Sequence, residues 1–270
     1  MTVRERRPRT ATPFALVPPA AIGALFLFVP ALALVVRAPW SDLLDIYRRN
    51  DFADALRISI VTAVEATVVS LVFGIPLAWV LARVRFRGMA VVRAFVTLPL
   101  VLPPVVAGIA LFYALGRLGI VGQYLYSWFG LALPFSQPGI VLAQTLVAMP
   151  FLVVTVEGAF RTSDRRLEEA AATLGASRLR VFTRVTLPLV TPSLVAGTVL
   201  CWARALGEFG ATQIFGGNLP GVTQTMPTLT FQAFQHRPED AIALSLPLMA
   251  VALLILLTLR DKWLRPAANS

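Results

Sequence analysis

Two oppositely charged residues stand four positions apart in an otherwise apolar stretch of the sequence. Arg204 and Glu208 lie within Cys201-Trp202-Ala203-Arg204-Ala205-Leu206-Gly207-Glu208-Phe209-Gly210-Ala211. Residues at this spacing share one face of a helix, so the two side chains can form an ion pair. In a bilayer, either charge alone would cost about 3 kcal/mol on insertion scales. Two interpretations stay open. The pair satisfies itself and helps helices pack, or it lies beside a pore where Arg204 acts on an anion.

A polar segment, residues 161–188, separates two long apolar stretches. It reads as two short helices that meet at Gly175, a residue suited to the left-handed conformation that ends a helix. Residues 162–164 can cap the first helix and Ser177 the second, while Pro188 either stops the second helix or starts the next element. The small alanine side chains of the first helix suit docking into a cleft of a second protein. An ordinary amphipathic loop is the alternative.

The other residues that could do chemistry do not assemble into a catalytic motif. Glu65 lies in an apolar stretch, where functional and structural roles are equally open. Glu157 is expected to pair with the arginines that follow it. Cys201 and His236 are each the single residue of their type, so neither a disulfide nor a metal site is expected. The sequence holds no Gly-x-x-x-x-Gly-Lys-Ser/Thr phosphate loop. We therefore expect no catalytic residue and no bound cofactor, and no ATP binding by this chain alone.

The composition is that of a membrane protein. Of the 270 residues, 57% are hydrophobic and only 14% are charged, against about 25% charged in soluble domains. Since the basic residues gather at the ends of apolar stretches, the net charge of +10 does not indicate nucleic-acid binding. We predict an all-α polytopic protein with six membrane spans, each near the required ~20 residues. The predicted spans are Leu16–Val36, Ile58–Leu81, Ala94–Leu115, Ile140–Val156, Val190–Phe215 and Ala241–Leu259.

The distribution of lysine and arginine predicts the orientation. With six spans, 17 of the 24 basic residues fall on the side that holds both termini and residues 161–188, six fall on the other side, and Arg204 stays in a span. The positive-inside rule puts the richer side in the cytoplasm. The predicted organisation is a cytoplasmic tail at 1–13, a membrane domain at 14–260 containing the cytoplasmic loop 161–188, and a cytoplasmic tail at 261–270.

The third predicted span contains Pro99 and the pair Pro103-Pro104. Proline removes backbone hydrogen bonds and bends a helix. Bent spans are common beside transport paths, although they also serve packing. Pro103 and Pro104 are therefore candidate residues of a path-lining helix.

The spacing within residues 161–188 resembles the signature loop of ABC-importer permeases. That signature has Glu-Ala-Ala, three residues, glycine, nine residues, an aliphatic residue, one residue and Leu-Pro. Here it is matched by Glu169-Ala170-Ala171, Gly175, Val185 and Leu187-Pro188, with Val185 where isoleucine is commoner. Three further stretches resemble the molybdate/tungstate branch of these permeases: 98–106, 203–211 and 217–221.

The resemblance implies the ABC-importer permease fold and a bacterial plasma-membrane location. It implies a homodimer of permease subunits, two separate ATPase subunits that use ATP and bind the cytoplasmic loops, and an extracytoplasmic oxyanion-binding protein. The expected substrate is molybdate or tungstate. Sulfate or thiosulfate is the alternative. A secondary transporter, with Glu65 and Glu208 at coupling-ion sites, would leave the Glu169 loop unexplained. A membrane-bound enzyme would need a polar catalytic cluster that the sequence does not show.

Overall fold

The computed structural model describes residues 14–263, and within that range every regular element is helical. The predicted tail at 1–13 and most of the predicted tail at 261–270 lie outside the described residues, while the last helix continues past the predicted boundary at 260. Five helices are long and apolar enough to cross a membrane. They are α1 (Val17–Val36), α3 (Asn50–Arg83), α7 (Gln137–Thr162), α10 (Leu187–Leu206, extended at its start by residues 178–186) and α12 (Pro238–Trp263).

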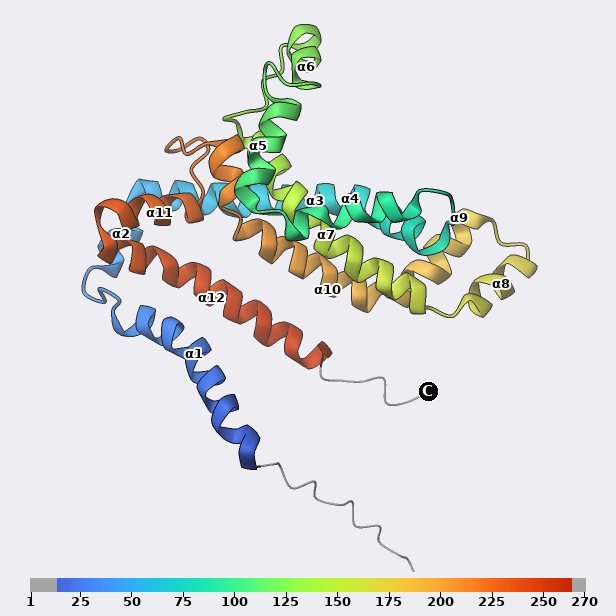
Figure 1. The fold of residues 1–270 in the computed structure, drawn as a ribbon, viewed down its shortest axis with the longest axis horizontal. Coiled ribbons are helices and arrows are strands. Elements are labelled where there is room, and N and C mark those ends of the chain that lie inside the picture. The colour runs from blue at the N-terminus through green and yellow to red at the C-terminus, as the bar shows by residue number, and fades with distance from the viewer. Residues whose placement is uncertain (1–13, 264–270) are drawn as a thin grey trace, which may run out of the picture.

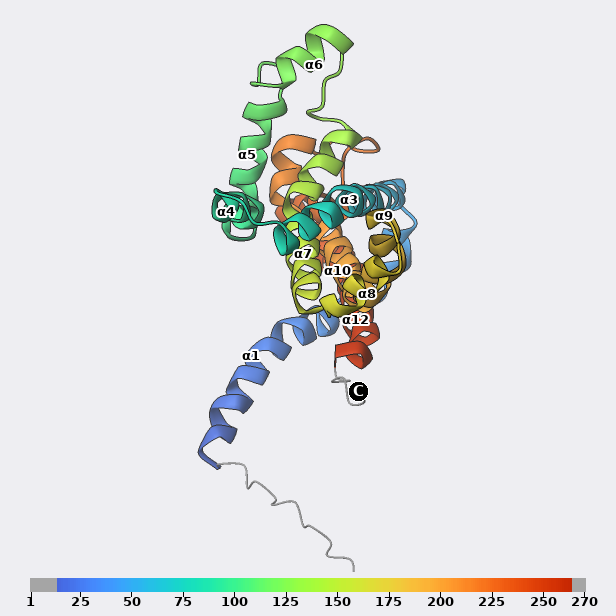
Figure 2. The ribbon, with the colours of Figure 1, turned by 90° about the vertical axis from the view of Figure 1, so that its right-hand side faces the viewer.

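The third predicted span is not one helix. It is divided into α4 (Met89–Val101) and α5 (Pro104–Leu115), 13 and 12 residues long. Leu102 and Pro103 between them have extended ψ values of 129° and 131°. A proline disfavours the helical conformation of the residue before it, and here two prolines act in succession. The sequence predicted a bend, whereas the structure has a complete break, after which α5 points away from the bundle (Figures 1 and 2).

The core lies where α3, α7 and α10 pack together. Small residues allow the close approach: Ala63, Ala66 and Ala78 are fully buried. A Cβ atom on Gly74 would lie 3.3 Å from side-chain atoms of Leu152 and Val153. In lipid, helices associate through such van der Waals packing, because burying apolar surface gives little advantage there. The three helices therefore form a rigid centre.

One helix that the sequence did not predict packs against α12 and α3 at the end of the bundle opposite α8 and α9. α11 (Met226–His236) begins with a capping box made by Thr225 and Thr228. The backbone N–H of Met226 donates to the Ser59 hydroxyl of α3 at 2.7 Å. The uncharged, semi-polar sequence of residues 223–236 suits them to lie on the outer surface or to meet an external partner. In the structure Thr223, Thr225, Met226 and Thr228 are buried, and α11 packs against α12 and α3.

The remaining elements occupy the two ends of the long helices and the end of the α5 projection (Figure 1). α2 (Leu43–Tyr47) lies beside α11, whereas α8 (Arg165–Thr173) and α9 (Arg178–Val181) lie at the opposite end. α6 (Gly122–Phe129) lies beyond α5. Three shorter turns complete the chain: η1 (Phe14–Leu16), η2 (Phe182–Thr186) and η3 (Thr212–Gly216). α1 has no buried residue and diverges from the bundle (Figure 2).

Candidate functional site

The loop that resembles the permease signature forms a helical hairpin. α8 begins at Asp164, whose Oδ1 accepts a hydrogen bond from the Arg166 N–H at 2.9 Å. It ends in a Schellman motif, in which Ala176 N–H donates to Ala171 O at 3.1 Å and Gly175 N–H donates to Ala172 O at 3.0 Å. Gly175 has φ = 83°, the left-handed conformation predicted from the sequence. The hairpin angle is therefore set by the backbone at a single residue.

The hairpin exposes apolar side chains next to charged ones. Leu174 is 89% exposed, and Leu167 and Leu179 are also exposed. Glu169 and Ala170 of the Glu-Ala-Ala triplet are exposed too, while Ala171 is half-buried. The exposed surface of the hairpin thus combines leucine side chains with charged ones.

The second arm of the hairpin continues directly into a long helix. Ser177 stands at the start of α9, although its side chain makes no capping hydrogen bond. The π-type turn η2 joins α9 to α10, and Pro188 lies in the first turn of α10. The sequence left open whether Pro188 stops the second short helix or starts the next element. In the structure Pro188 lies at the start of the next element, α10. Leu187 is half-buried and Pro188 exposed. Residues 178–206 therefore form one uninterrupted helical stretch of 29 residues.

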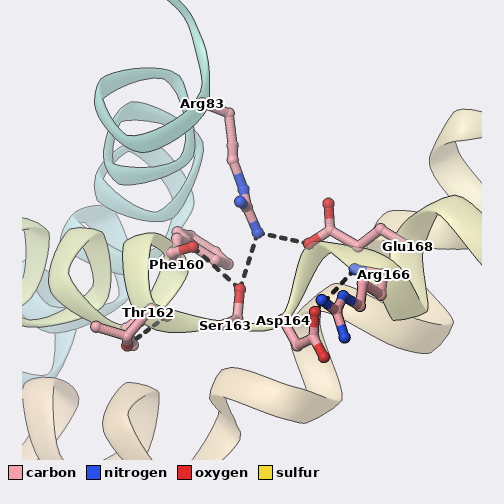
Figure 3. A network of polar contacts seen from close by, with 8 residues as sticks. Arg83, Phe160, Thr162, Ser163, Asp164, Arg166 and Glu168 are labelled. Carbon is pink, nitrogen blue, oxygen red and sulfur yellow. Dashed lines mark hydrogen bonds and ion pairs between the residues drawn. The ribbon is translucent and has the colours of Figure 1, made fainter.

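The first arm of the hairpin is tied to the core by an arginine that sequence analysis assigned no role. Arg83, the last residue of α3, donates through Nη2 to Ser163 Oγ at 2.8 Å and to Glu168 Oε1 at 2.6 Å (Figure 3). Ser163 in turn donates to the carbonyl of Phe160 at 3.0 Å. The sequence offered only the position of Arg83 at the end of a span as a signal.

A second ionic cluster lies near the same end of α7. Glu157 Oε1 forms an ion pair with Arg161 Nη2 at 2.9 Å, which confirms the predicted pairing with a following arginine. It also accepts from Arg93 of α4 at 2.8 Å, and Arg93 donates to the carbonyl of Leu81 as well. Arg93 therefore joins α4 to α7 and α3.

Arg204 and Glu208 form the ion pair that their spacing predicted. Arg204 Nη1 lies 2.5 Å from Glu208 Oε2. The other carboxylate oxygen of Glu208 accepts the Ala211 N–H at 2.8 Å, just after α10 ends at Leu206. The Glu208 side chain is 1% exposed and that of Arg204 is 27% exposed. Glu208 is thus fully engaged in structure, while the guanidinium keeps partial access to its surroundings.

The stretch that contains Pro103 and Pro104 contacts the stretch that contains the Arg204–Glu208 ion pair. A Cβ atom on Gly210 would lie 2.9 Å from Pro104 Cβ and 3.0 Å from the Val105 backbone nitrogen. A Cβ atom on Gly108 would lie 2.9 Å from Ala211 Cα. The first turns of α5 therefore rest on the segment after α10. The break at Pro103 and Pro104, the first exposed and the second half-buried, is held against the Arg204–Glu208 turn.

The end of the bundle opposite α8 and α9 carries its own polar contacts. Arg49, at the start of α3, bonds Asp240 of α12 at 2.7 Å, and this hydrogen bond raises the pKa of Arg49. The Tyr47 hydroxyl donates to the carbonyl of Ala243 at 2.8 Å, and burial raises the pKa of Tyr47. Glu65, in contrast, is exposed on α3 and takes part in none of the ion pairs formed among residues 14–263.

Comparison with known proteins supports the resemblance to ABC-importer permeases found in the signature loop. The family described as "Binding-protein-dependent transport system inner membrane component" matches residues 70–269. The molybdenum transport system permease protein ModB of Mycobacterium tuberculosis is 46% identical over 239 residues, covering 88% of this chain and 90% of that protein. ModB of Escherichia coli K12 is 43% identical over 78% of this chain and 92% of its own length. The sulfate transport system permease protein CysT of Salmonella typhimurium is 34% identical over 87% of this chain and 86% of its own.

Solved structures share the fold. A bacterial ABC transporter that imports the acidic polysaccharide alginate matches with a TM-score of 0.70 and 21% identity, over 93% of this chain and 94% of that one. The alginate transporter in complex with its pentasaccharide-bound periplasmic protein matches with a TM-score of 0.71 and 19% identity, over 95% of each chain. The resemblance found in the signature loop is therefore confirmed across most of the chain.

Proposed function

The chain belongs to the family of binding-protein-dependent transport system inner membrane components, and from this premise we propose that it is the multi-pass permease subunit of an ATP-driven importer of molybdate or tungstate. The choice of substrate rests on how closely the sequence matches permeases of each kind. The molybdenum permeases match at 43–46%, whereas the sulfate permease matches at 34%.

The hairpin of α8 and α9 is the proposed attachment site for a separate ATPase subunit. Its exposed leucines and the exposed Glu169 and Ala170 offer an apolar surface with an adjacent negative charge. ATP is bound and hydrolysed by that partner, and this chain contributes no catalytic residue. Because α9 continues into α10, closure of the ATPase would move the membrane helices as a rigid body.

A second copy of the chain is the proposed partner within the membrane. α1 has no buried residue, and large apolar side chains of α4 and α5, among them Phe95, Val101 and Tyr113, are exposed. Two copies that meet through such surfaces would enclose a path between them. An extracytoplasmic binding protein would deliver the oxyanion to that path.

Molybdate, tungstate and sulfate are all tetrahedral dianions, so charge alone cannot separate them. Ion size and the spacing of hydrogen-bond donors must decide, and the binding protein is the proposed site of most of that discrimination. Arg204 is the cation within a predicted span, and its partly exposed guanidinium could contact a passing dianion.

The test is uptake by proteoliposomes that contain this chain, its ATPase and its binding protein. We expect ATP-dependent accumulation of molybdate, competed by tungstate and not by an equal concentration of sulfate. Liposomes lacking the ATPase should accumulate none. Accumulation of sulfate in preference to molybdate would replace this proposal with a sulfate permease, the function of the 34% identical relative. Uptake without ATP would contradict an ABC importer altogether.

A further inference from the structure

Arg83 occupies an unusual position for a charged residue. It is the last residue of α3, and its side chain is only 8% exposed. Nη2 makes both of its hydrogen bonds, to Ser163 and Glu168. Nε and Nη1 are buried and have no hydrogen-bond partner in the part of the chain that the structure describes. A buried guanidinium is costly unless a carboxylate compensates it, so this group depends strongly on its single acidic partner.

The three residues of this contact belong to three different elements. Arg83 ends α3, Ser163 is the C-cap of α7, and Glu168 lies in the first turn of α8 (Figure 3). Apart from this contact, α8 packs mainly against α9 and η2, which belong to the same hairpin. Among the described ion pairs, Arg83–Glu168 alone joins α8 to another element. The second arm of the hairpin is held through α10 and through Phe182 of η2, which packs on Trp79 and Phe160. The first arm, α8, is joined to α7 by Ser163 and Asp164, and this ionic contact is its side-chain link to the end of α3.

We propose that Arg83 is a positioning residue for energy coupling. It fixes α8 to the end of α3, so that force applied to the hairpin reaches α3 and α7 as well as α10. This inference rests on the proposed function, because it needs an ATPase that pushes on the hairpin. With Arg83 in place, the three core helices move together. Without it, α8 tilts about Gly175 and Ser163, and part of the ATPase movement is lost before it reaches α3.

The neighbouring pair Arg161–Glu157 provides a matched comparison. Both residues lie on α7, four positions apart, and the Arg161 side chain is 49% exposed. Glu157 keeps Arg93 as a partner when Arg161 is removed. Neutralising Arg161 therefore removes one positive charge from the same end of the molecule without freeing any element.

The first experiment measures molybdate transported per ATP hydrolysed in proteoliposomes that contain the complete transporter. We expect Arg83→Gln and Glu168→Gln each to lower this ratio about fivefold or more, the lower end of typical coupling between sites. The double variant should transport no less molybdate per ATP than either single variant, because all three variants lose the same contact. Arg83→Lys, which keeps the charge, should recover part of the ratio, and Arg161→Gln should leave it unchanged.

The second experiment needs no substrate and no ATPase. Amide hydrogen exchange of the purified chain in detergent should show faster exchange in residues 165–173 of Arg83→Gln, with α3 and α7 unchanged in their protection. Arg161→Gln should match the unmodified chain. Glu168→Gln, which removes the same contact from the α8 side, serves as the second variant should Arg83→Gln fail to accumulate.

Two outcomes would overturn the proposal. Either α8 exchanges at the same rate in Arg83→Gln, or the variant loses transport and ATP hydrolysis in equal proportion, as expected of a purely structural residue. Failure of the proposed function gives a different result. If the unmodified complex transports sulfate and not molybdate, the ratio is measured with sulfate, and the exchange experiment stands as it is.

Discussion

Gly175 makes the turn of the hairpin in a left-handed backbone conformation. Its φ of 83° is one that L-residues rarely adopt, yet an added Cβ would meet no atom within 4 Å. Gly175→Val therefore creates no clash with the rest of the chain. It disfavours the left-handed turn instead, by about 1–2 kcal/mol or more for a β-branched side chain. We expect normal amounts of protein in the membrane with transport strongly reduced, measured as molybdate uptake per amount of permease.

Gly175→Asn is the control for that experiment, because asparagine tolerates the left-handed region. It should retain most of the transport activity. Equal loss in both variants would mean that the position is needed for direct contact rather than for its conformation.

Arg204 and Glu208 form an ion pair whose carboxylate is almost fully buried, and Arg204 is the basic partner of that carboxylate. Removal of one leaves the other charge buried, so each single change to glutamine should lower the thermal unfolding midpoint more than the double change does. The double-mutant cycle should give a coupling energy of about 0.5–3 kcal/mol. Additive effects would contradict a functional pair. Loss of anion uptake in Arg204→Gln at an unchanged unfolding midpoint would instead assign the guanidinium to the transport path.

At the level of elements, α5 is held by the close approach of backbones at Gly108. A methyl group there would lie 2.9 Å from Ala211 Cα and from Ile214 Cβ. We expect Gly108→Ala to destabilise the protein by about 1–3 kcal/mol through overpacking. Gly158→Ala on α7, where a Cβ meets nothing within 4 Å, should be neutral or stabilising by up to about 1 kcal/mol. Thermal unfolding in detergent compares the two. A similar effect of both would show that Gly108 is not a packing contact.

The elements also show where sequence reasoning succeeds and where it stops. Apolar length alone identified the five long helices, and local capping rules placed the turn at Gly175. At Pro103 the sequence predicted only a bend. It could not predict the complete break, because the packing of α5 against the segment around Gly210 is a contact between distant parts of the chain. Arg83 and Glu168 stand 85 positions apart. Their pairing follows from how α3 and α7 end side by side, which no local pattern encodes.

At the level of the whole molecule, the charge asymmetry predicts that the hairpin faces the cytoplasm. Ser177→Cys should resist a membrane-impermeant maleimide in intact cells and react after permeabilisation. The native thiol, Cys201, is buried, so it should add little background. Gln123→Cys, exposed on α6 at the predicted outer side, is the positive control. Labelling of Ser177→Cys from outside would refute the predicted topology.

The division of residues 89–115 into two helices also bears on how the chain is made. α4 and α5 have 13 and 12 residues, each shorter than the ~20 that a bilayer requires. Taken together they are long enough, and they leave the ribosome before Gly210 and Ala211, against which α5 packs. α5 can therefore take its packed position only after the second half of the chain has been synthesised. The native arrangement of the first half is thus a late event in biogenesis, completed by residues that follow their α5 partners by just over a hundred positions (from Pro104 to Gly210 and from Gly108 to Ala211).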